Sequence, residues 1–259
     1  MFFENWDLLV LLLALVPAFY LGLPLLIRMQ QRFQAHPELR ELRLERLDRN
    51  ISRFLMSRAE ALFELGFEEP TLVRLPDPVP NVTGYLIMLV NRKTGDKAMV
   101  TALIGTGAAA IRTLYVEFST RFDTGEVFNT MNSEQLNAFP PAPKTVRTQV
   151  PMMADPQELF RLHTFVMNKH GATGKKELYE PGTALEYLVE YAFARMYGIQ
   201  ADRGWLSYDR RSDTYQPTIK GAYLICWGLL PPFKWLRQAA MMRRARQILI
   251  EFQREDVVA

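Results

Sequence analysis

Hydrophobic and polar residues are arranged differently in four successive parts of the chain. The first part is an apolar run over residues 8–27, LLVLLLALVPAFYLGLPLLI, which contains no charged side chain. A helix rises about 1.5 Å per residue, so this run spans about 30 Å, the thickness of the hydrocarbon core of a bilayer. Pro17 and Pro24 lie inside the run, and membrane helices tolerate proline. We therefore predict that residues 1–32 form an N-terminal transmembrane anchor.

The residues on either side of the apolar run predict its orientation. The first seven residues contain Glu4 and Asp7 but no lysine or arginine, and no A-x-A-like cleavage site follows the run. Both features favour an uncleaved anchor over a signal peptide. By the positive-inside rule, the arginines after the run place the N-terminus outside and residues 33–259 in the cytoplasm. These arginines are Arg28, Arg32, Arg40, Arg43, Arg46, Arg49, Arg53 and Arg58.

The second part, residues 33–69, has helical periodicity. Apolar residues recur every three or four positions from Leu39 to Phe63, charged residues occupy the positions between them, and Gly66 follows. This pattern is typical of an amphipathic helix that begins near a proline and ends at a glycine. We expect one long helix, or two shorter ones, over residues 37–65, as a stalk that follows the anchor.

The third part, residues 70–218, predicts a cytosolic α+β domain. It opens with four prolines between positions 70 and 80, which indicate an extended linker. Strand-like runs separated by turn residues follow at 84–90, 97–104, 113–122 and 126–131. We interpret these runs as two hairpins that form a small antiparallel sheet, and further prolines between 140 and 151 indicate a second extended segment.

Three more elements are expected in this domain. Asp155 and Pro156 are typical of the first residues of a helix, which we expect to continue to about His170. A second helix is predicted over residues 182–197, before Gly198, and a short hairpin over residues 203–218.

The fourth part, residues 219–259, combines apolar and basic residues. The apolar run over 222–230 is too short to span a bilayer, and a basic amphipathic helix is predicted over 233–252. Two interpretations stay open, because this part could dip into the membrane surface or pack as a core helix of the domain. Under the first interpretation, the candidate membrane-surface residues are Lys234, Trp235, Arg237, Arg243, Arg244 and Arg246.

Composition and charge add a candidate partner. The chain is 49% hydrophobic and 23% charged, which excludes a wholly disordered protein. Its net charge is only +3, but eight arginines face four acids in residues 28–58, and six basic residues face three acids in residues 233–259. Because the basic residues gather beside the apolar segments, the charge favours an anionic inner leaflet as partner over nucleic acid.

Two glycine-rich segments match nucleotide-binding motifs only in part. Residues 105–110 read GTGAAA, but the next strand follows too soon for the helix that a dinucleotide fold requires. Residues 171–176 read GATGKK and lack the first glycine and the final Ser or Thr of a phosphate loop. We expect connecting loops at both places and no cofactor.

Residue types that carry catalysis are sparse. His163 and His170 lie two helical turns apart, and about 10 Å is too far for them to share one metal ion. The remaining histidine is His36, and the single Cys226 lies in an apolar run where a thiol usually packs. We therefore predict no metal site and no catalytic residue, and we favour a non-catalytic protein over an enzyme.

One short segment resembles a known family. Residues 204–209 (GWLSYD) and 213–221 (DTYQPTIKG) are similar to the wing of a winged-helix domain, where a tyrosine-rich hairpin precedes a helix opened by Thr-x-Lys-Gly. The resemblance implies a winged-helix-like shape in this segment. The helix predicted before it carries Glu186 and Glu190 and few basic residues, unlike a recognition helix that binds phosphates.

Together these features predict a membrane-anchored α+β protein. The favoured role is a non-catalytic scaffold, accessory subunit or regulatory adaptor with a protein partner. The alternatives are a membrane-tethered winged-helix-like regulator and an enzyme that acts on a membrane-associated substrate.

Overall fold

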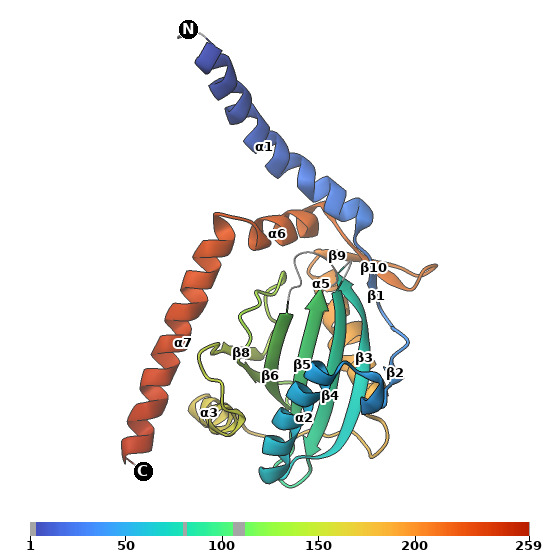
Figure 1. Cartoon of the computed structure of the whole chain (residues 1–259), viewed down its shortest axis with the longest axis vertical. Coiled ribbons are helices and arrows are strands. Elements are labelled where there is room, and N and C mark those ends of the chain that lie inside the picture. Colours follow the sequence, from blue (N-terminus) through green and yellow to red (C-terminus); the bar gives the residue numbers. More distant parts are fainter. Residues whose placement is uncertain (1–3, 80–81, 106–111, 259) are drawn as a thin grey trace. The chain divides into compact units, whose positions relative to one another are not determined.

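The computed structural model describes residues 4–79, 82–105 and 112–258. Its elements form two compact units, and each is assembled from separate stretches of the chain (Figure 1). The first, which we call the α1 unit, comprises the chain up to His36, Leu136–Pro140 and Glu190–Ala239. The second, the sheet unit, comprises Pro37–Gln135, Pro141–Val189 and the chain from Ala240 onward.

The α1 unit joins one long helix to a small antiparallel sheet with the strand order β1-β10-β9. The hairpin expected over residues 203–218 is therefore confirmed, and β1 adds a third strand to it. The elements of this unit are α1 (Glu4–Gln30), β1 (Phe33–Gln34), α5 (Arg195–Asp202), β9 (Leu206–Asp209), β10 (Thr214–Pro217), α6 (Ile219–Leu229) and the first turns of α7 (Phe233–Val258).

The sheet unit is built on a seven-stranded sheet with the order β2-β3-β4-β5-β6-β7-β8. Neighbouring strands are antiparallel, except that β7 and β8 are parallel. The strands are β2 (Arg40–Glu41), β3 (Glu68–Val79), β4 (Val82–Asn91), β5 (Asp96–Gly105), β6 (Arg112–Arg121), β7 (Val127–Met131) and β8 (Thr145–Gln149). The helical elements are η1 (Leu44–Arg46), α2 (Arg49–Glu64), α3 (Pro156–Lys169), α4 (Ala184–Leu188) and the later part of α7.

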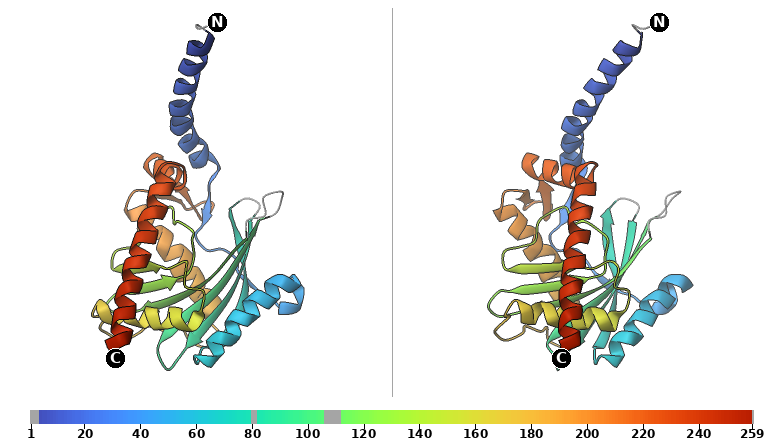
Figure 2. Two further views of the ribbon diagram at one scale, coloured as in Figure 1. Left: turned by 60° about the vertical axis from the view of Figure 1, so that its left-hand side comes forward. Right: turned by 90° about the vertical axis from the view of Figure 1, so that its left-hand side faces the viewer.

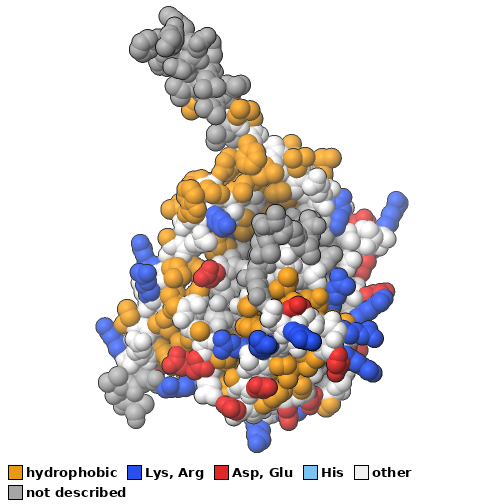
Figure 3. Space-filling model, viewed as in Figure 1, with side chains coloured by type: hydrophobic (Ala, Val, Ile, Leu, Met, Phe, Trp, Pro, Cys, Tyr) orange, Lys and Arg blue, Asp and Glu red, His pale blue; other side chains and the backbone are white. Residues whose placement is uncertain are grey.

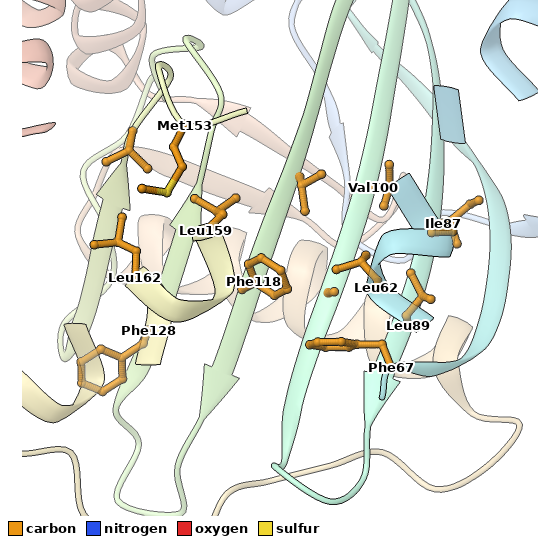
Figure 4. Close-up of a cluster of buried hydrophobic side chains, with 14 of the residues drawn as sticks. Leu62, Phe67, Ile87, Leu89, Val100, Phe118, Phe128, Met153, Leu159 and Leu162 are labelled. Carbon is orange, nitrogen blue, oxygen red and sulfur yellow. The ribbon is translucent and has the colours of Figure 1, made fainter. Parts of the chain in front are cut away.

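One face of this sheet packs against α2 and α3 (Figure 2). Successive side chains of a strand point to opposite faces, so alternate residues such as Leu89, Val100 and Phe118 line the covered face and are buried. Leu62 from α2 and Leu159 from α3 meet them in the same cluster (Figure 4). This layer of helices on a sheet forms the hydrophobic core of the unit.

The later part of α7 also packs in the sheet unit. Ala245 and Phe252 are buried, and the ring of Phe252 meets that of Phe165 on α3 edge-on, with 5.5 Å between ring centroids. Lys169 on α3 forms an ion pair with Glu251. For this part of the helix, packing in the domain is thus the interpretation that the structure supports.

Several predicted elements are confirmed. The four strand-like runs between residues 84 and 131 are β4, β5, β6 and β7, and the helix expected after Asp155 is α3. The side chain of Asp155 accepts hydrogen bonds from the amides of Gln157 and Glu158, so the expected cap is present. Between β4 and β5, Gly95 has a φ of 80°, a conformation that glycine adopts without strain.

The expected sheet of two hairpins is wrong, because β2 and β3 extend it on one side and β8 on the other. β3 occupies the residues expected to be a proline linker. A proline cannot donate to the ladder, but β3 has only the two-residue β2 on its outer side, so few hydrogen bonds are missed there. β8 lies in the second expected extended segment and pairs with β7.

The helix expected over residues 37–65 begins later than predicted. The amide of Leu42 donates to the carbonyl of Leu72 at 2.8 Å, so this segment is extended and pairs with β3. α2 begins only after Asp48, whose side chain caps the helix by accepting from the amide of Asn50 at 2.8 Å.

The helix expected over residues 182–197 does not end at Gly198. α4 is followed by the π-helical segment η2 (Val189–Ala194) and then by α5, which ends at Asp202. Gly204, with a φ of 73°, turns the chain into β9.

Candidate functional site

The most prominent surface of the α1 unit is apolar. Among the described residues, α1 is the one helix that is long and apolar enough to cross a membrane, over Leu13–Gln30. Among its described side chains, Leu13 is 68% exposed and Leu21 is 56% exposed. Exposure of these apolar side chains to water is unfavourable, so we expect another apolar surface or phase to contact this helix.

One side of α6 packs within the α1 unit, and α6 contacts the C-terminal part of α1. The buried residues of α6 are Gly221, Ala222, Ile225, Cys226 and Gly228, and all lie on one face of the helix. The hydroxyl of Tyr223 donates to the carbonyl of Leu21 at 3.4 Å. α6 therefore lies across the C-terminal part of α1 (Figure 1).

Small residues and a cap fix α6 in this position. A Cβ added to Gly221 would overlap the carbonyl oxygen of Trp205, so only glycine lets α6 approach that backbone. The side chain of Thr218 accepts from the amide of Gly221 at 3.1 Å and donates to the carbonyl of Gly204 at 2.8 Å. These contacts tie the start of α6 to the residues before β9.

The opposite side of α6 and the start of α7 expose large apolar side chains. Their exposed fractions include 41% for Trp227, 45% for Phe233 and 63% for Trp235. The rings of Trp227 and Phe233 stack at 6.2 Å between centroids, so they form one continuous surface. We call this surface the aromatic corner; its members are Ile219, Trp227, Leu229, Phe233, Trp235 and Leu236. Figure 3 shows hydrophobic side chains gathered over α6, beside the C-terminal part of α1.

Arg237, a candidate membrane-surface residue, is engaged inside the α1 unit. Its Nη1 donates to the carbonyl of Gly228 at 2.8 Å, and its Nη2 donates to the carbonyl of Asn137 at 2.6 Å. A Cβ on Gly228 would overlap Nη1 of Arg237, so the guanidinium lies directly on the backbone of α6. Arg237 thus fastens α6, α7 and the Leu136–Pro140 segment to one another.

The structure divides the other candidate membrane-surface residues between the two units. Lys234 and Trp235 are exposed on the first turn of α7, beside the aromatic corner. Arg243, Arg244 and Arg246 are exposed on the part of α7 that belongs to the sheet unit, where Ala245 between them is buried. The six residues therefore do not form one patch within a single unit; we treat them as two groups.

The chain after α1 is fastened to the β9–β10 hairpin by residues that the sequence analysis did not assign to a site. Nδ1 of His36 lies 3.0 Å from the Asp213 carboxylate. The hydroxyl of Tyr208 donates to the same carboxylate at 2.6 Å, which lowers the pKa of Asp213 and raises that of Tyr208. The amide of Ala35 donates to the carbonyl of Asp213 at 3.0 Å. α1 is therefore joined to this hairpin through a short connection.

A second group of polar residues lies in the core of the sheet unit. Nε2 of His163 lies 2.8 Å from the hydroxyl of Thr120, and Nδ1 lies 2.9 Å from the hydroxyl of Thr130. Thr120 donates in turn to Asp96, which also accepts from Lys176 at 2.8 Å. Burial lowers the pKa of His163 to about 4. His163 and Thr120 are 0% exposed, so this network holds α3 to the sheet and presents no nucleophile to a substrate.

The sheet unit also has a surface hollow of about 450 Å³ beside the β6–β7 turn. Nζ of Lys144 donates to the carbonyl of Thr124 at 3.0 Å, and the hydroxyl of Thr124 donates to Glu126 at 3.2 Å. The lysine and the threonine hydroxyl are thus already engaged, and we assign no ligand to this hollow.

The remaining motifs provide no site in the described part of the chain. Within it, no group of three or more His, Cys, Asp or Glu side chains could hold a metal ion. The GTGAAA segment lies outside the described residues from position 106 onward, and it connects β5 to its antiparallel neighbour β6. In the GATGKK segment, the Lys176 side chain belongs to the buried network, and Cys226 is buried in α6.

Comparison with known proteins adds no further assignment. No protein-family model, no curated protein and no solved structure matches the chain.

Proposed function

We propose that the chain is a single-pass membrane protein and that its role is that of a non-catalytic scaffold, accessory subunit or regulatory adaptor. α1 crosses the bilayer with the N-terminus outside, and the sheet unit lies in the cytoplasm. The observation that carries this proposal is the exposed apolar surface of α1, which the hydrocarbon core of a bilayer would cover.

Two further observations support the orientation and the role. The arginines that follow α1 favour a cytoplasmic location for the residues after it. The sheet unit has a well-packed core whose buried histidine is fully engaged in hydrogen bonds, which suits a rigid interaction domain better than an active site. The protein partner of this domain remains part of the proposal, identified only as a cytosolic protein.

Reporter fusions test the orientation. Alkaline phosphatase and a fluorescent protein are fused separately to the C-terminus, and the membranes are washed with alkaline carbonate. We expect a bright fluorescent fusion, an inactive phosphatase fusion and retention in the membrane pellet. An active phosphatase with a dark fluorescent protein would reverse the orientation. Release by carbonate, or a product shortened at its N-terminus by mass spectrometry, would instead contradict the anchor.

A membrane-tethered winged-helix-like regulator is the second candidate, and one observation favours it. α5, the β9–β10 hairpin and α6 follow one another along the chain as a helix, a wing and a helix, and Arg210 and Arg211 are exposed at the tip of the hairpin. If this candidate is right, the protein binds duplex DNA with a strong salt dependence, and R210E/R211E weakens binding more than the matched variant K93E/K175E in the sheet unit. Equal binding by the two variants would contradict it.

A further inference from the structure

We propose that α6 and the first turns of α7 form a membrane-interface foot, which lies in the headgroup region of an anionic bilayer beside the end of α1. This inference rests on the proposed function, because it assigns a lipid surface as the partner of the aromatic corner. The foot would set how deep α1 sits and how the α1 unit is oriented against the leaflet.

The shape of α6 favours an interfacial position over a second crossing. Its residues Ile219–Leu229 span about 16 Å as a helix, roughly half of what a bilayer core requires. α6 packs against the C-terminal part of α1, Trp227 is exposed on the side opposite its buried residues, and Ile219 and Leu229 are exposed at its two ends. A short helix with one covered and one exposed apolar side is suited to lie along a surface.

The side chains of the aromatic corner match the chemistry of the bilayer interface. Tryptophan is enriched at the level of the headgroups, where its ring is buried and its N–H stays near water. Trp227 and Trp235 are both more than 40% exposed here, although neither gains from contact with water. Because this surface continues that of α1, a bilayer that contains α1 is the occupant that would cover both.

Charge specifies the kind of lipid. Lys220 is exposed next to Ile219, Lys234 is exposed between Phe233 and Trp235, and Arg28 is exposed in the last turn of α1. The sequence from Thr214 to Ile250 contains no aspartate or glutamate. An acidic headgroup would therefore meet lysines without a competing carboxylate from this stretch, and each basic residue near an anionic surface contributes about 1 kcal/mol.

The hydrogen bonds of Arg237 make the foot rigid. The guanidinium is held by two carbonyl oxygens, so it positions the α6–α7 corner instead of reaching for a headgroup. We therefore assign lipid contact to Lys220 and Lys234 and a positioning role to Arg237.

Tryptophan quenching in vesicles tests the foot. The full chain with W6F and W205F retains Trp227 and Trp235, and it is reconstituted into phosphatidylcholine vesicles with and without phosphatidylglycerol. Brominated lipids place the quencher either close to the headgroup or close to the end of the acyl chain. We expect the shallow bromines to quench about twofold more than the deep ones, because interfacial helices lie about 5–10 Å into the headgroup boundary. A matched variant with W6F, W227F and W235F, which retains Trp205, should be quenched less.

Two results would overturn the foot. Absence of quenching at both depths would mean that the corner lies outside the membrane, and stronger quenching by the deep bromines would place it in the hydrocarbon core. Carbonate extraction of the same vesicles keeps this inference distinct from the proposed function. Loss of quenching with the protein still resistant to carbonate contradicts the foot alone, whereas extraction of the protein contradicts the anchor.

A charge variant tests the lipid class. K220E/K234E should remove the increase in quenching that phosphatidylglycerol causes, while the matched variant K93E/K175E, which changes net charge equally in the sheet unit, should retain it. Circular dichroism checks that both variants are folded. An equal loss in both variants would show a general effect of net charge and would overturn the assignment of Lys220 and Lys234.

Discussion

The Nε2 atom of His163 lies 2.8 Å from the hydroxyl of Thr120, and this contact connects α3 to the C-terminal end of β6 inside the core of the sheet unit. A buried polar group is stabilising only when its hydrogen bonds are made. Both ring nitrogens of His163 have a hydroxyl partner, and burial disfavours the charged ring, so the neutral imidazole is the form that this core accommodates.

The stability of the protein should fall as the pH decreases from about 6.5 to about 4. The folded state holds the pKa of His163 near 4, below its ordinary value of 6.5, mainly through burial. Between these two pKa values, His163 is protonated in the unfolded chain but not in the folded chain. Its contribution to the free energy of unfolding is therefore complete above pH 6.5 and is lost as the pH falls toward 4. The shift corresponds to about 3 kcal/mol. Urea unfolding in detergent micelles at a series of pH values measures it.

His163→Gln isolates this effect from the titration of carboxylates. Glutamine does not titrate, so the difference between the wild type and H163Q should shrink toward low pH. His170, which is exposed at the end of α3, provides the control, and H170Q should keep the pH profile of the wild type. A wild-type profile that coincides with that of H163Q would contradict the burial of a neutral imidazole.

Gly221→Ala should destabilise the α1 unit by about 1–3 kcal/mol, because the added methyl group would overlap the carbonyl of Trp205 and α6 would have to move. Hydrogen exchange of the α6 amides measures the loss of protection. Gly22→Ala in α1 is the matched control, since a Cβ at Gly22 has nothing within 4 Å. Equal protection of α6 in G221A and G22A would contradict the close approach.

Arg237→Met should loosen the corner between α6 and α7. The change removes two hydrogen bonds from a charged donor and keeps most of the aliphatic chain, for an expected cost of about 1–3 kcal/mol at this half-buried site. Faster proteolysis between Leu229 and Ala239 is the measurement. Lys234→Met removes a charge three residues earlier without a comparable contact, and it should leave the rate unchanged. Similar rates for both variants would argue against the positioning role of Arg237.

Arg243, Arg244 and Arg246 should supply a salt-sensitive attraction to anionic vesicles. In a chain that lacks residues 1–20 but keeps Leu21, whose carbonyl contacts α6, sedimentation with such vesicles should weaken as salt rises. The triple change to glutamate should weaken the salt-sensitive part, leaving the contribution of Lys220 and Lys234, and it should not unfold the protein, because all three side chains are exposed and the packing of Ala245 is retained. The triple change to lysine should preserve it. Undiminished sedimentation of the glutamate variant would favour another role for these arginines.

Elements defined by local chemistry could be predicted from the sequence. The start of α3 followed from Asp155 and Pro156, because Asp is favoured at the N-cap of a helix and Pro at its first position. The hairpins followed from turn residues such as Gly95 between runs of apolar residues. The apolar run of α1 was equally local, because length and lack of charge are sufficient to recognise it.

Elements that depend on distant partners could not be predicted in this way. The periodicity of residues 37–48 resembles that of a helix, but pairing of Leu42 with Leu72 makes the segment extended. The parallel pair of β7 and β8 likewise depends on how the chain returns to the sheet. His163 could not be distinguished from any other helical histidine, since its hydroxyl partners lie on strands more than 30 residues earlier. The aromatic corner was only partly anticipated, because the sequence does not tell which side of α6 is covered by α1.

The alternation of the two units along the chain has a consequence for biosynthesis. α1 is translated well before Glu190–Ala239, the stretch that completes its unit. At a synthesis rate of about 5–20 residues per second, α6 is synthesised about 10–40 s after α1. During this interval the chain of the sheet unit emerges almost completely. The apolar C-terminal part of α1 therefore lacks its contact with α6 while translation continues. Early insertion of α1 into a bilayer would protect the nascent chain from aggregation during this time.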